Sequence, residues 1–581
     1  MKKFCRTRFD KTFSPFHFSA FPLYNCKMSQ KSVRTFQENS LKIESISFSQ
    51  IPHQSKLFLD FQNNSGEIVK FYPEKQTDLN AFAEKVLSNY TTDRTELCNA
   101  LQEINRSIGV GEKTLENIEL LREKDCLAIV TGQQAGLFSG ALYTIYKALS
   151  AVKMCEDLRR QNIKAVPVFW IAEEDHDFDE VKKTYVFSEP SAGKLNAITN
   201  TPKFYTENTP VGFVKLDETI TETIESLNLP RTEFSAKVEE ILNKTYRSGE
   251  TYSTAFAKFL AKIFADYGLI FLSPLNEKLK KLSAPIFAEA IDKSGEIADL
   301  LFQRNTELEE KNYSAQVLVE ENFFPFFYQT ETRQAMRRDL QSEKVKVQKS
   351  KTEFTIDELK EIAENSPQNL SPNALMRPIV QDYLLPTLTY FGGGAEIAYF
   401  AQNAVIYEVL NRPVTPIRHR SSFTIIEPKN RRTLEKYGFN FTDLFDGKEK
   451  FEAQISEKFL NREIAEVFAE TEEVIKTQLN KLDRLLSISE PTLAENSANR
   501  RKKILWHIGA LRKKYHRAEI LKNETVNRRL ETLFTSVLPH NALQERTLGV
   551  LTFLNLYGEN FIKWVYNAID SDEKGHQIIF L

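Results

Sequence analysis

The clearest hydrophobic pattern in the chain is a strand, a loop, a helix and a second strand within about 45 residues. Residues 127–130 form a short apolar run that predicts a buried strand, and residues 165–172 form another. Between them, Ile145, Leu149 and Val152 recur at helical spacing. Such a unit places two parallel strands in one sheet with the helix across its face. We therefore predict an α/β fold with a parallel sheet.

Beyond about residue 447 the pattern changes to that of long helices. Glycine and proline become rare, and apolar positions at helical spacing continue on both sides of Pro491. Residues 461–490 carry seven acidic and four basic side chains, whereas residues 497–530 carry eleven basic and two acidic ones. Opposite charges beside a shared apolar seam favour pairing of the two helices over separate packing on the core. We predict an antiparallel α-helical coiled coil.

These patterns divide the chain into four expected segments. Residues 1–27 are basic and poor in acidic side chains, and Met28 suggests that they are a disordered extension or the product of a mis-assigned start. The other segments are an α/β core (28–446), the helical hairpin (447–540) and a C-terminal segment that packs back on the core (541–581). Within the core, residues 335–368 are charged and weakly patterned, which predicts a surface insertion.

Charge and cysteine content narrow the possible partners. The chain has 77 Lys and Arg residues against 79 Asp and Glu residues, so it lacks the overall basic field typical of nucleic-acid binding. Its five cysteines include no CxxC pair and no Cys/His ligand spacing, which disfavours a disulfide scaffold and structural zinc. No apolar run approaches the roughly 20 residues that span a bilayer. We expect a cytoplasmic protein that binds neither nucleic acid nor a membrane.

The first candidate site is the loop at residues 131–140, with the sequence TGQQAGLFSG. It follows a predicted strand and precedes a helix, where backbone N–H groups and the helix dipole attract anions. The loop has neither the GxGxxG nor the GxxxxGKS/T spacing, so it indicates neither NAD binding nor P-loop hydrolysis, and a tight structural turn is the alternative. We expect nucleotide contacts from Thr131, Gly132, Gly136 and Gly140, and substrate contacts from Gln133, Gln134 and Ser139.

The second candidate site is the cluster EEDHDFDE at residues 173–180, directly after the second predicted strand. Open parallel sheets place their sites beyond the carboxyl ends of the strands. We expect His176 to act as an acid or base with Glu174 or Asp175, and Trp170 to contact substrate. Two alternatives stay open: a metal ion held by Asp175, His176 and Asp177, or a polar loop that caps the next element.

The third candidate site combines residues 371–382 with the glycine-rich turn that follows Tyr390. Polar groups among apolar neighbours suggest substrate contacts, and an arginine there suggests anion recognition. A structural ion pair between Arg377 and Asp382 is the alternative. The substrate-contacting residues expected here are Asn373, Arg377, Asp382, Tyr390 and Glu396.

Four blocks together resemble one known family. They are TGQQAGLFSGALYTIYK (131–147), FWIAEEDHDFDE (169–180), SPNALMRPIVQD (371–382) and GGGAEIAYFAQ (392–402). In order and spacing they resemble the signature blocks of the bacillithiol-biosynthesis cysteine-adding enzymes, and the likeness runs from about Met28 to the C-terminus. The resemblance implies a Rossmann-like parallel-sheet core with inserted connecting segments, and a coiled coil that forms a homodimer. It also implies a ligase that adds cysteine to glucosaminyl-malate in the last step of bacillithiol synthesis.

Amide formation from a free carboxylate needs activation, which raises the question of a nucleotide. The chain has neither the HIGH nor the KMSKS motif with which the related class I aminoacyl-tRNA synthetases bind ATP, and Lys147 is expected to lie too far along its helix to replace them. ATP or another nucleotide is therefore a hypothesis. In the working mechanism the 131–140 loop binds the activated carboxyl or phosphate, His176 deprotonates the attacking amine, and Arg377 with Asn373 holds the malate carboxylates.

Two other function classes compete with the ligase. One is a metal-dependent hydrolase or phosphotransferase that uses the acidic and histidine cluster at residues 173–180. The other is a non-catalytic nucleotide-binding scaffold that works through the coiled coil. Metal content after purification and the effect of gene deletion on small thiols separate both from the ligase.

Overall fold

The structure is a computed structural model that describes residues 34–35, 41–74, 78–188, 194–342 and 344–581. The expected N-terminal extension, residues 1–27, lies outside these described residues.

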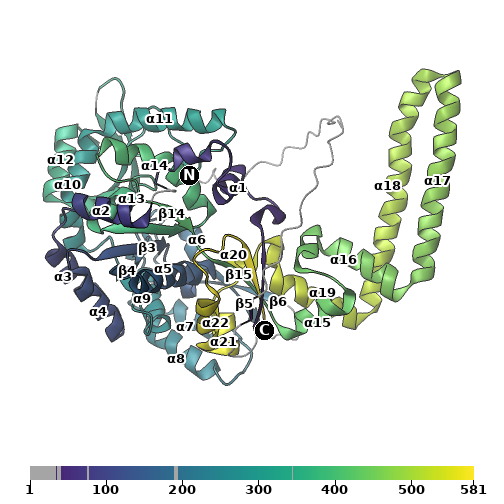
Figure 1. Cartoon of the computed structure of the whole chain (residues 1–581), viewed down its shortest axis with the longest axis horizontal. Helices are drawn as coiled ribbons and strands as arrows, with labels where there is room; N and C mark the ends of the chain where they lie inside the picture. The colour runs from purple at the N-terminus through teal and green to yellow at the C-terminus, as the bar shows by residue number, and fades with distance from the viewer. Residues whose placement is uncertain (1–33, 36–40, 75–77, 189–193, 343) are drawn as a thin grey trace.

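A parallel sheet forms the centre of the fold (Figure 1). Its strands, in spatial order, are β14 (Ile417–His419), β13 (Thr387–Gly392), β3 (Leu127–Gln133), β4 (Ala165–Ile171) and β7 (Ile270–Leu272). All four neighbouring pairs run parallel, which confirms the predicted α/β class. From β3 the chain builds the sheet first towards β7 and later towards β14, so the strand order reverses between β3 and β13. Binding sites in open α/β sheets lie at this point.

Both faces of the parallel sheet are covered by helices. The predicted connection from β3 to β4 is α5 (Tyr143–Arg160), which packs against both strands. Along β3 the side chains alternate: Ile129 packs with the α5 side of the sheet, and Val130 packs with the opposite core. Both side chains are fully buried. This two-sided burial explains why these strands appear in the sequence as continuous apolar runs.

A second, antiparallel sheet lies in the connection between β7 and β13. Its order is β11 (Glu353–Phe354), β10 (Val345–Val347), β9 (Arg333–Arg338), β8 (Phe326–Gln329) and β12 (Leu370–Pro372). The segment predicted as a surface insertion, residues 335–368, contains β10, β11 and most of β9. Met336, Val345 and Val347 are buried, while the charged side chains between them lie on the other face. Strands this short give too little alternation to be recognised in the sequence.

A third sheet joins parts of the chain that are distant in sequence. Its order is β1 (Arg34–Thr35), β2 (Lys42–Ile46), β16 (His576–Phe580) and β15 (Ser422–Ile426). The strand β16 pairs antiparallel with β2 and parallel with β15. The segment after the helical hairpin thus returns to the body of the molecule.

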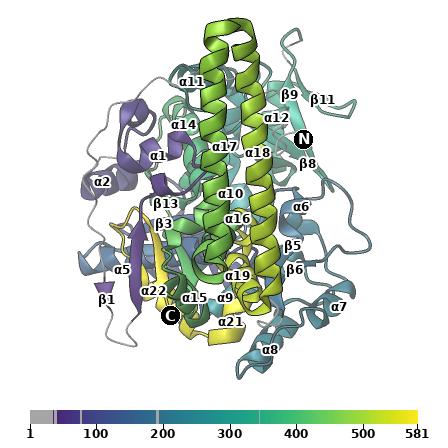
Figure 2. The ribbon, with the colours of Figure 1, turned by 90° about the vertical axis from the view of Figure 1, so that its right-hand side faces the viewer.

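The helical hairpin projects from the body (Figures 1 and 2). It consists of α17 (Arg462–Ser489) and α18 (Pro491–Lys522), and it confirms the predicted coiled coil. Proline at the first position of α18 suits a helix start, because its missing N–H would have no helical partner there. Charged pairs connect the helices as the charge pattern predicts: Arg501 lies 2.9 Å from Asp483, and Arg512 lies 3.0 Å from Glu472.

The remaining elements are helices around the three sheets and one separate β-hairpin. The helices are α1 (Lys56–Asn63), α2 (Leu79–Asn89), α3 (Arg94–Ile108), α4 (Glu112–Leu121), α6 (Phe178–Val181), α7 (Thr219–Glu225), α8 (Ser235–Thr245), α9 (Tyr252–Ile263), α10 (Glu277–Asp292), α11 (Ser294–Glu310), α12 (Ile356–Asn365), α13 (Arg377–Leu384), α14 (Gly394–Val409), α15 (Pro428–Tyr437), α16 (Lys448–Ile455), α19 (Glu524–Val537), α20 (Gln544–Thr547), α21 (Leu551–Tyr557) and α22 (Asn560–Ala568). A hairpin is formed by β5 (Lys183–Ser188) and β6 (Lys194–Thr199).

Candidate functional site

A large cleft opens beyond the carboxyl ends of β3, β4 and β13. Its empty volume is about 1880 Å³, and residues of β8 and β9 line its other side. The cleft therefore lies between the switch point of the parallel sheet and the antiparallel sheet, a usual place for a binding site. A smaller chamber of about 690 Å³ adjoins it. The two chambers share five lining residues: Gln133, Gln134, Tyr143, Glu180 and Arg546.

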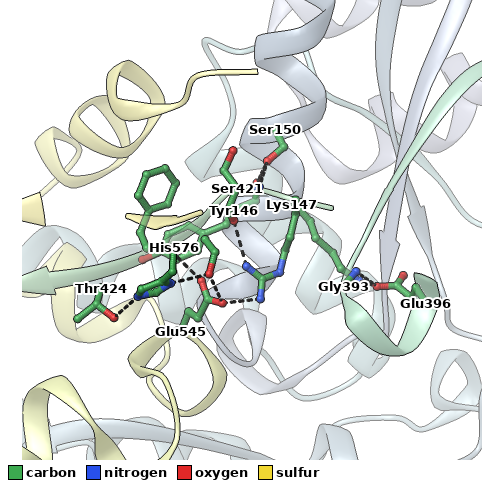
Figure 3. A network of polar contacts seen from close by, with 12 residues as sticks. Tyr146, Lys147, Ser150, Gly393, Glu396, Ser421, Thr424, Glu545 and His576 are labelled. Atoms are coloured by element: carbon green, nitrogen blue, oxygen red, sulfur yellow. Dashed lines mark hydrogen bonds and ion pairs between the residues drawn. The ribbon is translucent and has the colours of Figure 1, made fainter. Parts of the chain in front are cut away.

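A buried ion pair links the first and third candidate sites. Lys147 Nζ lies 2.5 Å from Glu396 Oε2, and it donates to Gln133 Oε1 at 2.8 Å and to the Gly132 carbonyl at 2.9 Å. Figure 3 shows Lys147 and Glu396 together. The expectation that Lys147 lies too far along its helix is wrong, because helical side chains point back towards the N-terminus. An ammonium has three donors, and here each of them has an acceptor.

Glu396 is held in place at the start of α14. The Gly393 N–H and the Tyr390 hydroxyl each donate to its carboxylate at 2.7 Å. Burial alone would raise the pKa of Glu396, but Lys147 and these donors together lower it. Its place in the first helical turn is the one that the sequence predicts. Glu396 therefore lines the cleft as an ionised, fully engaged carboxylate.

Asp175 is also engaged by its neighbours. Its carboxylate accepts a hydrogen bond from Gln134 Nε2 at 2.5 Å and one from the His176 backbone N–H at 2.7 Å. Arg333 Nη1 lies 3.7 Å away. Burial would raise the pKa of Asp175, but Arg333 and Gln134 outweigh burial and lower it. An ionised carboxylate with a lowered pKa is a weak base, so Asp175 is better suited to positioning than to proton abstraction.

The two glutamates before Asp175 are taken up by the protein. Glu174 forms a buried ion pair with Lys280, whose Nζ lies 2.5 Å from its Oε1. Glu173 accepts hydrogen bonds from the hydroxyls of Ser253 and Ser273. Glu174 lines the cleft, yet its pairing with Lys280 leaves it ill suited to the expected role of a base.

His176 is the group of this cluster best suited to accept a proton. It lines the cleft with a side chain that is 18% exposed, and its Nδ1 has no hydrogen-bond partner within the described chain. Burial lowers the pKa of His176, and Arg333 lowers it further, against the opposing effect of Asp175 and Asp177. A lowered pKa keeps the imidazole neutral at neutral pH.

Glu180 lies at the junction of the two chambers. Partial desolvation in the cleft raises the pKa of Glu180 to about 7, and the carboxylates of Asp175 and Asp177 contribute. Its carboxylate makes no hydrogen bond or ion pair within the part of the chain that the structure describes. In the sequence, Glu180 is the last residue of the acidic cluster at residues 173–180, and nothing in the pattern sets it apart from its neighbours.

Arg377 lines the cleft and is held by neighbouring side chains. Its guanidinium donates to Gln381 Oε1 at 2.9 Å and to the Tyr399 hydroxyl at 3.0 Å, and it lies 5.3 Å from the centre of the Tyr390 ring. Trp170 also lines the cleft, with its indole 5.9 Å from the guanidinium carbon. The alternative of an ion pair between Arg377 and Asp382 is wrong, because Gln381 lies between them in the hydrogen-bond chain.

The other two predicted residues of this block have structural partners. Asn373 accepts the backbone N–H groups of Leu375 and Met376 at 3.1 and 3.0 Å, so its carbonyl closes a turn at the wall of the cleft. Asp382 is not among the residues that line the cleft. Its carboxylate accepts a hydrogen bond from the Tyr407 hydroxyl instead. The structure thus does not bring Asp382 to the other candidate residues.

The glycine-rich loop has a different geometry from the predicted anion site. Thr131 is buried in the sheet, where its hydroxyl donates to the Phe391 carbonyl at 2.8 Å. The backbone N–H groups of Gly136, Ser139 and Gly140 all donate to carbonyls within the loop. They are therefore not available to a phosphate in this conformation. Gly136, Ser139 and Gly140 line the smaller chamber, and Gly132 lines the large cleft.

A third buried ion pair supports the cleft from behind. Arg420 lies 2.6 Å from Glu545, and the Ser422 hydroxyl also donates to this carboxylate, at 2.8 Å. Figure 3 shows Glu545 next to His576, whose Nε2 lies 2.8 Å from the Thr424 hydroxyl. Burial lowers the pKa of His576 to about 4. This network connects the cleft-lining Arg420 to the third sheet.

Several cleft residues had no signal in the sequence. Arg333 stacks at 4.0 Å on the Phe327 ring, and Arg337 lies on the same strand, β9. Arg420 and Arg546 come from the C-terminal third of the chain and line the same cleft. Isolated arginines far apart in sequence form no motif, so only the fold brings them together.

The metal-ion alternative depends on a group of side chains arranged to coordinate a cation. Within the described residues, no group of three or more His, Cys, Asp or Glu side chains is arranged to hold a metal ion. Of the three donors that the metal hypothesis names, Asp175 is engaged by the protein, since it accepts a hydrogen bond from Gln134 and lies near Arg333. No helix in the described ranges is both long and apolar enough to cross a membrane.

Comparison with known proteins gives a consistent family. Residues 41–421 match the N-terminal Rossmann-like domain of the bacillithiol biosynthesis protein BshC, and residues 423–581 match its C-terminal coiled-coil domain. A protein of Koribacter versatilis is 34% identical over 90% of this chain and 97% of its own length, and one of Salinibacter ruber is 30% identical over 90% and 96%. A protein of Chlorobaculum tepidum is 30% identical over 87% and 93%. All three bear the name "Putative cysteine ligase BshC". Both domain matches and the relatives matched over most of their length name the same family, so the chain belongs to the BshC family of bacillithiol biosynthesis.

Proposed function

We propose that this protein is a carbon–nitrogen ligase that joins the carboxyl group of cysteine to the amine of glucosaminyl-malate, forming bacillithiol. Membership of the BshC family supports this function. The observation that carries it is the two-chambered cleft, with His176 in the large chamber and cationic side chains on several walls. Two substrates that must react with each other need two adjoining sites, and a dicarboxylate such as malate needs cations.

In this proposal the large chamber holds glucosaminyl-malate. Arg337 lines it, and the only side-chain hydrogen bond of its guanidinium in the described chain goes to the neighbouring Met336 carbonyl, so donors remain for a carboxylate. Arg377 and Asn373, the residues expected to bind malate, have protein partners instead, and they support the wall that malate contacts.

His176 accepts the proton of the attacking amine. The amine nitrogen attacks the activated cysteine carbonyl, the activating group leaves with its bonding electron pair, and the amine proton passes to the imidazole. The His176 side chain is 18% exposed in the cleft and its Nδ1 makes no hydrogen bond to the described residues, so the imidazole is free to take up this proton. Asp175 fixes the backbone of His176 through its 2.7 Å contact with the His176 N–H.

Activation of the carboxyl group calls for a cosubstrate such as ATP. Lys147 is not free to bind its phosphates, since its three donors serve Glu396, Gln133 and Gly132. We propose a nucleoside triphosphate as this cosubstrate, with the ligase reaction itself as the test.

The test mixes the full-length protein, glucosaminyl-malate, cysteine and each nucleotide in turn, and detects bacillithiol by mass spectrometry. We expect product with at least one nucleotide and a loss of about 100-fold or more in rate for His176→Ala, in line with general-base contributions. The matched control is His53→Asn, because His53 is exposed and its positive φ of 62° suits asparagine. Unchanged product formation by a folded His176→Ala protein would refute the base assignment.

We also propose that the protein is a homodimer that associates through the helical hairpin and works in the cytoplasm. Large apolar side chains of the hairpin are exposed, among them Leu485 (56%), Ile488 (79%) and Trp506 (68%). Exposed apolar surface of this kind marks interfaces. Free, buried thiols at Cys98, Cys126 and Cys155 suit a reducing compartment.

Light scattering coupled to size-exclusion chromatography tests the dimer. We expect twice the chain mass for the wild type and the monomer mass for Leu485→Glu/Ile488→Glu. The control is Phe204→Glu, which charges another exposed apolar residue (91%) on the body. A wild-type protein that elutes as a monomer at micromolar concentration would refute the dimer.

A further inference from the structure

The smaller chamber is lined by buried hydroxyl groups that make no hydrogen bond to the described residues. Ser139, Thr144 and Thr184 line it and are 0%, 1% and 3% exposed. Within the described chain, the side-chain oxygen of each makes no hydrogen bond, and the same holds for Gln134 Oε1. Buried polar groups are nearly always hydrogen-bonded, and leaving one unsatisfied costs about 1–3 kcal/mol. Four such atoms around one chamber indicate a site built for a polar ligand.

The backbone of this chamber is strained as well. Phe138 and Ser139 adopt φ values of 52° and 79°, which are unfavourable for residues with a side chain. A Cβ atom on Gly136 would lie 2.9 Å from the Cα of Gly140, so the loop needs glycine to fold this tightly. Strained, buried loops of this kind occur mainly at functional sites.

Charges of both signs lie at the mouth where the chamber joins the large cleft. Arg546 and Glu180 line both chambers, and neither side chain makes a hydrogen bond or ion pair with the described residues. Lys183 also lines the chamber, with its Nζ 4.4 Å from the centre of the Tyr185 ring. A guanidinium and a carboxyl group, both without partners among the described residues, match the carboxylate and the ammonium of a free amino acid.

We propose that the smaller chamber is the binding site for a zwitterionic amino acid with a small polar side chain. The α-carboxylate binds Arg546, the α-ammonium binds Glu180, and the side chain points towards the hydroxyls of Ser139, Thr144 and Thr184. If the proposed ligase function holds, on which this identification rests, the amino acid is cysteine. Its carboxyl group then lies at the junction, facing the amine in the large chamber.

Calorimetric titration of the full-length protein with L-cysteine under reducing conditions tests the site, with and without glucosaminyl-malate. We expect L-serine to compete, and both cysteamine, which lacks the carboxylate, and 3-mercaptopropionate, which lacks the ammonium, to bind at least tenfold more weakly. These comparisons need no variant. Equal affinity of the two analogues and cysteine, or no cysteine binding in either condition, would overturn the proposal.

Isosteric variants locate the site. We expect Thr184→Val to weaken cysteine binding severalfold and to leave glucosaminyl-malate binding unchanged, because Thr184 lines only the smaller chamber. Its melting temperature should not fall, since the lost hydroxyl has no partner. The matched control Thr389→Val removes another buried, unpartnered hydroxyl outside both chambers and should leave cysteine binding unchanged.

The charged mouth is tested in the same way. We expect Arg546→Met to weaken cysteine binding at least tenfold, and Arg529→Met, an exposed arginine on α19, to have no effect. If Arg546→Met and Thr184→Val both keep wild-type cysteine affinity, or both form bacillithiol with an unchanged KM for cysteine, the site is refuted while the ligase function stands. If amino acids bind as expected and no nucleotide supports bacillithiol formation, the ligase function fails and the site stands.

Discussion

Lys147 shows how a single residue joins parts of the cleft that are distant in sequence. Its ammonium connects the loop after β3 with the start of α14, through contacts to Gln133, Gly132 and Glu396. Burial lowers the pKa of Lys147, and Glu396 opposes this effect. A buried pair of this kind contributes little net stability, but the loss of one partner leaves the other charge unpaired in the interior.

At the residue scale, we therefore expect Lys147→Met to destabilise the protein by about 3–5 kcal/mol and to abolish ligase activity. The double variant Lys147→Met/Glu396→Gln should regain part of the stability and none of the activity, because the unpaired charge is gone and the loop is still unsupported. Thermal unfolding followed by circular dichroism measures this. Lys244→Met, which breaks the exposed pair with Glu240, should leave the melting temperature nearly unchanged.

At the scale of elements, β3 and β4 approach closely at the edge of the cleft. Gly132 is paired with Trp170, and a Cβ atom at Gly132 would lie 2.8 Å from the Trp170 carbonyl oxygen. The obstacle is backbone, so it cannot rotate away. Glycine at this position thus allows the two strands to bring the loop and the indole to the same wall.

We expect Gly132→Ala to destabilise the protein by about 1–3 kcal/mol, as overpacking of a core does. Gly509→Ala is the control, because a Cβ there meets nothing within 4 Å and the residue lies inside α18. That change should stabilise α18 by about 0.5–1 kcal/mol, since alanine favours helix more than glycine does. Equal melting temperatures for the two variants would contradict the close approach of β3 and β4.

The same elements show what the sequence can predict. The parallel strands and the hairpin are recognisable because each has a long local pattern, apolar in Ala165–Ile171 and periodic with opposite charges in α17 and α18. The antiparallel sheet escapes prediction because its strands are short and charged on one face. Residues of all three candidate motifs line one cleft, but the partners that decide each role lie far away in sequence. Lys280 for Glu174 is one example, and Arg333 for Asp175 is another.

At the scale of the whole molecule, a buried network connects the cleft to the third sheet. Burial would raise the pKa of the Glu545 carboxyl. Arg420 and the hydrogen bonds to this carboxylate outweigh burial and lower the pKa to about 2. His576 on β16 lies beside it, and burial lowers the pKa of this imidazole to about 4. Both groups therefore make the folded state take up protons less readily than the unfolded chain.

This network predicts acid sensitivity with a defined window. An unfolded histidine takes up a proton below about pH 6.5 and the buried His576 only near pH 4, so stability should fall by up to about 3 kcal/mol over this interval. Glu545 adds a further loss below about pH 4.5. The variant His576→Gln should flatten the first part of the curve. Thermal unfolding at closely spaced pH values measures it, and an unchanged slope between pH 6.5 and 4 would contradict the role of His576.

The position of β16 has a consequence for how the protein is made. At about 5–20 residues per second, a ribosome needs roughly half a minute to two minutes between β2 and β16. During that time β2 has no β16 to pair with, although the two strands are neighbours in the finished sheet. An unpaired strand edge of this kind attracts other chains. Nascent copies of this protein are therefore natural clients for chaperones that shield such edges until synthesis has passed β16.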